Sequence, residues 1–130
     1  MRRRTVLLML VPLLLVALAC SGSQSGSSAS TSSTQPAQSG TVAVSVVDNN
    51  FRPQDVTVTV GSTVIWTNEG RADHNIVAFG ATPFHVDTAS FGPGATYSWT
   101  ATEPGTYRYY CSIHGAPTAA MYGSVTVVGR

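Results

Sequence analysis

The stretch TYRYYCSIHGAPTAAM, residues 106–121, contains the pattern that decides the fold of this 130-residue chain. Its first six residues alternate, so Tyr107, Tyr109 and Cys111 share one face of an extended strand. Arg108 lies on the other face. If the arginine faces water, the cysteine points inward. The stretch therefore predicts a β-strand that carries a shielded thiol at its end.

The second half of the stretch adds two more sulfur or nitrogen donors. His114 follows Cys111 by three positions, and Met121 follows His114 by seven. A thiolate, an imidazole and a thioether form a soft donor set that suits copper better than magnesium or calcium. A lone buried cysteine is usually an inert apolar residue, but its two neighbours favour a metal site. The set needs a second imidazole from elsewhere in the chain.

Short strand-like segments continue this pattern from Thr41 to the end of the chain. Alternating apolar and small polar residues are separated by turn residues, and no segment has a helical period. The sequence therefore predicts one all-β domain, residues 41–130, built as a Greek-key antiparallel β-sandwich or barrel. The expected strands are residues 41–46, 56–60, 63–68, 74–79, 96–100, 106–111 and 123–128. Tyr107, just after Pro104-Gly105, is either a tyrosine corner or an ordinary strand aromatic.

The first nineteen residues have the layout of a secretory signal peptide. Arg2, Arg3 and Arg4 form a basic start, and an apolar run from Thr5 to Ala19 follows. A transmembrane helix needs about 20 apolar residues, whereas this run is shorter and contains a proline. We therefore expect residues 1–19 to be removed on export.

Cys20 directly follows this signal, and Val16–Cys20 resembles a bacterial lipobox. The resemblance implies cleavage before Cys20 and lipidation of its thiol. The alternative is an ordinary cleavage site, with Cys20 free or bonded to Cys111. Residues 21–40 are small and uncharged, which predicts a flexible tether from 20 to 40 and favours the lipid. We expect an exported protein, anchored to the membrane on its periplasmic or extracellular face.

The charge of the exported chain excludes one class of partner. Without the signal, four arginines and six acidic residues remain, for a net charge of −2 with neutral histidines. The sequence contains no lysine. A nucleic-acid-binding protein needs a basic surface, so we expect no nucleic-acid partner.

Two histidines are candidates for the missing imidazole. His74 begins an apolar, strand-like run, whereas His85 lies in an irregular segment rich in glycine and proline. A metal ligand needs a rigid scaffold that imposes its geometry. His74 is therefore the better candidate, and we expect His85 to be a solvated loop residue.

The order and spacing of these residues resemble the cupredoxins, in particular the plastocyanin and amicyanin group of small blue-copper proteins. The likeness covers residues 41–130. It is carried by Phe51-x-Pro53, Val56, Val58, Gly61, Val64, Trp66, Asn68, His74-Asn75, Gly105-x-Tyr107-x-Tyr109-x-Cys111-x-x-His114 and Met121.

The resemblance implies one type 1 copper ion with His74, Cys111 and His114 as trigonal ligands and Met121 as the weak axial ligand. It also implies that the Asn75 side chain bridges toward the cysteine-bearing loop and supports the site. The chain departs from the family in the six residues between His114 and Met121, which form a longer segment than plastocyanins and amicyanins have.

The function expected from these residues is one-electron transfer with copper alternating between Cu(II) and Cu(I). Small apolar residues around His114 suit weak, transient docking of a redox protein, and a lipid anchor would concentrate partners in the same membrane. We expect a monomer. We also expect no enzymatic activity, because three histidines cannot build the second copper centre that a copper enzyme needs. The alternatives are a copper store or chaperone, a metal-free structural sandwich, and a zinc site with an unusual thioether ligand.

Overall fold

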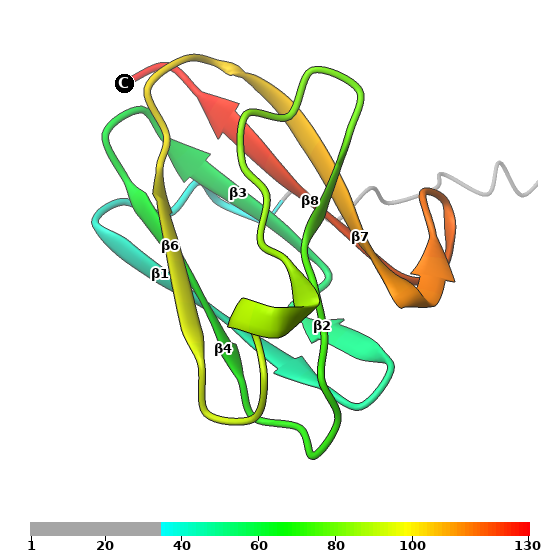
Figure 1. Cartoon of the computed structure of the whole chain (residues 1–130). Coiled ribbons are helices and arrows are strands. Elements are labelled where there is room, and N and C mark those ends of the chain that lie inside the picture. The colour runs from blue at the N-terminus through cyan, green and yellow to red at the C-terminus, as the bar shows by residue number, and fades with distance from the viewer. Residues whose placement is uncertain (1–34) are drawn as a thin grey trace, which may run out of the picture. The chain divides into compact units, whose positions relative to one another are not determined.

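Eight β-strands in two four-stranded sheets make up residues 35–130, the part of the chain that the computed structural model describes (Figure 1). The predicted signal peptide, Cys20 and the first part of the predicted tether lie outside the described residues. Within residues 35–130 there is no helix with the length and hydrophobicity needed to span a bilayer.

The first sheet has the order β2-β1-β4-β6. Its strands are β1 (Thr41–Val47), β2 (Asn50–Arg52), β4 (Thr63–Asn68) and β6 (Thr96–Thr100). The second sheet has the order β3-β8-β7-β5. Its strands are β3 (Asp55–Thr59), β5 (Val77–Phe79), β7 (Gly105–Ala116) and β8 (Ala119–Val128). A short 3₁₀ turn, η1, covers Thr88–Ser90.

The period-two pattern of the strands explains how the sheets form one core. In β4 the buried positions are Val64, Trp66 and Asn68, and the residues between them are only half-buried. Trp66 is fully buried and its ring lies 5.1 Å from that of Phe84 and 5.5 Å from that of Tyr109 (centroid distances). Alternation therefore places one apolar face of each sheet inside the sandwich.

The β-sandwich is confirmed, but two strand pairs are parallel, whereas the sequence predicted antiparallel pairing throughout. β1 runs parallel to β4, and β3 runs parallel to β8. The chain leaves the first sheet after β2, forms β3 in the second sheet, and returns in β4 beside β1. This crossing between sheets brings strands of the same direction together, which a hairpin cannot do.

The run from His74 to Phe79 is a strand only at its end. β5 begins at Val77, and Ile76 makes a single bridge to Val86. The expectation that His74 lies on a strand was wrong. Its backbone N–H instead donates a hydrogen bond to the Phe91 carbonyl (3.3 Å), so a loop contact fixes this residue.

Tyr107 forms the tyrosine corner that the sequence left as one of two alternatives. Its hydroxyl donates a hydrogen bond to the Glu103 carbonyl (2.9 Å). A side-chain carbon at Gly105 would lie 3.3 Å from this phenol, so the absence of a side chain at Gly105 gives the ring its place. The corner holds the turn that leads into β7, the strand of the predicted thiol.

The chain joins the second sheet before Thr41. The Gln38 N–H donates to the Thr57 carbonyl, and the Thr59 N–H donates to the Gln38 carbonyl, both at 2.9 Å. These two bonds form a parallel bridge on the outer edge of β3.

Candidate metal centre

Three predicted ligand residues converge at one end of the sandwich. The Cys111 Sγ lies 3.7 Å from His74 Nδ1 and 3.6 Å from His114 Nδ1, and the two nitrogens are 3.2 Å apart. Donor atoms that bind one transition-metal ion at about 2.0–2.3 Å lie roughly 3–4 Å from one another. The three separations fit a single ion, and among the described residues these three form the only such cluster of histidine, cysteine and carboxylate side chains.

A large irregularity in β7 carries two of the three donors. Tyr110 pairs with Tyr122 and Gly115 pairs with Ala120, so the four residues from Cys111 to His114 stand opposite Met121 alone. A bulge of this kind turns side chains away from the regular sheet pattern. It allows Cys111 and His114, three positions apart, to face the same point.

The same register brings Met121 to the site. Met121 is fully buried and is the single β8 residue that faces the bulge. The long segment between His114 and Met121 is mostly paired. Four of the six residues form two ladder pairs, Gly115–Ala120 and Ala116–Ala119, and the turn between them completes a hairpin. The extra length therefore forms the tip of this hairpin.

Burial favours the neutral form of His74. His74 is fully buried, and this desolvation, with a smaller contribution from nearby His114, lowers the pKa of His74. A neutral imidazole keeps a lone pair on one nitrogen for a metal. Nδ1 faces the other two donors, and Nε2 has no hydrogen-bond partner within residues 35–130.

Asn75 ties the loop of His74 to the strand of Cys111. Its Oδ1 accepts a hydrogen bond from the Ser112 N–H (2.8 Å), and its Nδ2 donates to the Ser112 hydroxyl (2.8 Å). Nδ2 also lies 3.3 Å from the Thr88 hydroxyl in η1. The bridge is the one implied by the family resemblance. Neither Ser112 nor Thr88 belongs to a periodic pattern, so sequence reasoning did not identify them.

The remaining histidine takes no part in the cluster. His85 is exposed, and its Nε2 lies 2.8 Å from an Asp87 carboxylate oxygen. This agrees with the expectation of a solvated loop residue, and it leaves His74 as the second imidazole of the site.

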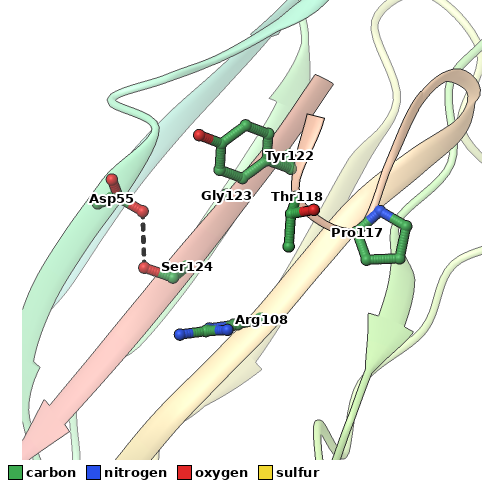
Figure 2. A pocket seen from close by; sticks show the side chains of 7 residues that line it. All are labelled: Asp55, Arg108, Pro117, Thr118, Tyr122, Gly123 and Ser124. Carbon is green, nitrogen blue, oxygen red and sulfur yellow. Dashed lines mark hydrogen bonds between the residues drawn. The ribbon is translucent and has the colours of Figure 1, made fainter. Parts of the chain in front are cut away.

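A separate groove of about 320 Å³ lies on the outer face of the second sheet (Figure 2). The Ser124 hydroxyl donates to Asp55 across it (2.6 Å), and Pro117 and Thr118 of the hairpin tip form one wall. Arg108 and Tyr122 also line it, and it shares no residue with the three-donor cluster.

The sequence of the chain is similar to known copper proteins. Residues 39–128 match the family described as copper binding proteins of the plastocyanin/azurin type. Chloroplastic plastocyanin of Oryza sativa subsp. indica is 40% identical over 85 residues, which cover 59% of this chain and 54% of that protein. Plastocyanin of Sambucus nigra is 38% identical over 87 residues, and the match covers 86% of it. The chain thus spans about half the length of the chloroplastic relatives.

Solved structures agree with this similarity. An amicyanin variant superposes with a TM-score of 0.57 at 27% identity, over 67% of this chain and 81% of that one. A copper-containing nitrite reductase from Thermus scotoductus SA-01 has the same TM-score at 35% identity, but the likeness covers only 22% of that chain. The match to small copper proteins spans most of their length, whereas the match to the nitrite reductase covers less than a quarter of that chain. It belongs to the plastocyanin/azurin family of copper-binding proteins, as a small cupredoxin whose cofactor is copper.

Proposed function

We propose that this protein is a one-electron carrier whose copper ion is held by His74, Cys111 and His114, with Met121 as the axial ligand. The convergence of a buried thiol with two imidazoles, at separations that fit one ion, is the observation that supports it most directly. When bound, copper supplies the one-electron couple Cu(II)/Cu(I).

The described residues hold the donors in a fixed arrangement. His74 and Cys111 are fully buried, and the Asn75–Ser112 hydrogen bonds join the two segments that carry them. A ligand set held by packing and hydrogen bonds changes little when the charge of the site changes. That rigidity favours repeated electron transfer over storage, which requires a site that opens.

His114 provides the route to the surface. It is half-buried, whereas its neighbour Ile113 is 49% exposed. The hairpin tip beside it presents small uncharged residues, namely Ala116, Pro117, Thr118, Ala119 and Ala120. A small apolar surface without charges suits a brief encounter with a redox protein, of the kind that buries less than about 1,200 Å².

The proposal extends to where the protein works. A lipid on Cys20 and a flexible tether would hold the copper domain, as a monomer, at the outer face of a membrane, within reach of redox partners there. Mass spectrometry of the purified membrane form tests the lipid, because a diacylated N-terminus at Cys20 has a distinct mass. An unmodified N-terminus, or one at another residue, contradicts the anchor but not the copper site.

The copper proposal is tested on the full chain loaded with Cu(II). We expect one tightly bound ion, an intense thiolate-to-copper absorption band, and loss and recovery of this band through cycles of one-electron reduction and oxidation. A colourless complex contradicts the proposal. Rapid loss of copper to a chelator in either oxidation state also contradicts it and supports a store or chaperone.

Replacing Met121 by leucine is expected to retain the blue Cu(II) site and raise its reduction potential. A weak thioether donor favours Cu(II), and an apolar side chain of similar size removes that donation while filling the space. Electrochemistry and the visible spectrum of the purified variant measure the two effects. Loss of copper binding in this variant would show that Met121 is a principal ligand and that the ligand order is wrong.

Replacing Asn75 by alanine is expected to weaken copper affinity by about 10–100-fold, the usual cost of removing a group that orients a metal ligand. The change removes both bonds to Ser112 and leaves the Ser112 N–H without its acceptor. Competition with a chelator measures the affinity. Ser112→Ala is the matched control, because it removes only the hydroxyl contact and should cost less. Equal affinities of Asn75→Ala and wild type would refute the role of the bridge.

A further inference from the structure

We infer that Gly115 is the positioning residue for the axial thioether, and that the hairpin tip it begins clamps Met121 in place. The inference rests on the proposed function, in which Met121 is the axial ligand. It assigns a purpose to the segment that makes this chain differ from the plastocyanin and amicyanin pattern.

The backbones of Gly115 and Met121 lie unusually close together. A Cβ placed on Gly115 would be 2.5 Å from the Met121 nitrogen, 2.7 Å from the Met121 carbonyl oxygen and 3.0 Å from the Ala119 carbonyl oxygen. Non-bonded atoms prefer separations of about 3.5–4.0 Å. All three contacts are with backbone, so no side-chain rotation would relieve them. Any residue other than glycine must move β7 and β8 apart at this point.

The ladder shows why such a movement reaches Met121. Met121 lies between two ladder pairs, Tyr110–Tyr122 on one side and Gly115–Ala120 on the other. The four bulged residues of β7 lie opposite it. The Tyr110–Tyr122 pair belongs to the regular sheet. Beyond Met121, β8 is held against β7 only by the hairpin tip. Separation of Gly115 from Ala120 would therefore free one of the two points that fix Met121.

The conformation of Ala120 supports the same conclusion. Ala120 has a φ of 58°, a left-handed conformation that is unfavourable for a residue with a side chain. Such a residue persists only where its surroundings impose the conformation. Here it directly precedes Met121 and faces Gly115. The tip is thus a constrained element that ends at the axial ligand.

Gly115→Ala in the copper-loaded full chain tests the inference. A thioether that is moved away from the copper ion should act like a missing one, so we expect the reduction potential to rise. The expected change in the Cu(II)/Cu(I) equilibrium is at least about tenfold, which is about 59 mV for one electron. The electron paramagnetic resonance spectrum should change with it, and one copper per chain should remain bound. Gly129→Ala is the control, because Gly129 has open space around it and an ordinary φ, and it should leave the potential unchanged.

The double variant Gly115→Ala/Met121→Leu shows whether the effect passes through Met121. If Gly115 acts on the thioether, its substitution adds nothing to the potential of Met121→Leu. An equal shift in both backgrounds, or wild-type potential and spectrum in Gly115→Ala alone, overturns the inference. A wild-type protein without a blue band overturns the proposed function instead.

A second variant covers the case in which Gly115→Ala does not fold. Deletion of residues 116–119 removes the tip and leaves both Gly115 and Met121 in the chain. Thermal unfolding of each metal-free variant establishes that it is folded before copper is added. The inference expects the deletion also to raise the potential and alter the resonance spectrum, and a folded deletion variant with the wild-type potential overturns it.

Discussion

Replacing Cys111 by serine is expected to abolish the intense visible absorption of the copper-loaded protein. The absorption arises from charge transfer between thiolate sulfur and Cu(II), and a serine hydroxyl is a hard oxygen donor that stays protonated at neutral pH. Cys111 Sγ is the atom that both imidazoles face at 3.6–3.7 Å, so the substitution removes the soft donor from the centre of the set. Visible spectroscopy after Cu(II) loading measures the result.

Cys20→Ser is the matched control for that experiment, because it makes the same chemical change at the other cysteine of the chain. The Cys20→Ser protein lacks the proposed lipidation site, so it is purified from the soluble fraction. We expect it to keep the full absorption band. A band that persists in Cys111→Ser would mean that another group binds copper, and it would refute the assignment of all three trigonal ligands together.

Replacing Trp66 by alanine is expected to lower the free energy of unfolding of the metal-free protein by about 3–5 kcal/mol. Trp66 is fully buried, and its ring contacts those of Phe84, Tyr97 and Tyr109 at centroid distances of 5.1–5.9 Å. Domains of this size are stable by only about 5–15 kcal/mol, so the loss would remove a large part of the total. The midpoint and slope of urea unfolding measure it.

Trp66→Phe separates packing from polarity at the same position. The Trp66 Nε1 and the Tyr109 hydroxyl are buried without a hydrogen-bond partner among residues 35–130. Burial raises the pKa of Tyr109, and the nearby indole N–H of Trp66 lowers it by a smaller amount. The two groups do not reach hydrogen-bond geometry. Phenylalanine keeps a ring and removes an uncompensated N–H, so it should cost clearly less than alanine. Equal losses for the two variants would contradict this account.

The sequence predicted the parts of the site that depend on the alternation of side chains along a strand and on the chemistry of the donor groups. Alternation from Tyr107 to Cys111 placed the thiol inside, and the structure buries Cys111 fully while leaving Arg108 exposed. The structure places His74, and not His85, beside Cys111 and His114, although His74 does not lie on the strand that the sequence predicted. His74 is held by a loop hydrogen bond and by burial, which a strand pattern does not report.

The features that the sequence did not predict depend on contacts between distant segments. The parallel pairing of β1 with β4 follows from a crossing between sheets that no local pattern records. The residues after His114 have the composition of a loop, yet Ala116 and Ala119 pair as the last rung of a hairpin. Gly115 is one of twelve glycines in the chain, and only its approach to the Met121 backbone distinguishes it.

The Gln38 bridge on β3 has a consequence for how the protein behaves when many copies are crowded together. An unpaired strand at the edge of a sheet offers its N–H and C=O groups to another chain and so promotes aggregation. Gln38 forms hydrogen bonds with the outward-facing carbonyl of Thr57 and the outward-facing N–H of Thr59. The opposite edge strand, β5, is only three residues long. The edge strand β2 of the other sheet is equally short. The bridge therefore protects the sheet that carries Cys111, His114 and Met121 from pairing with a strand of a neighbouring molecule.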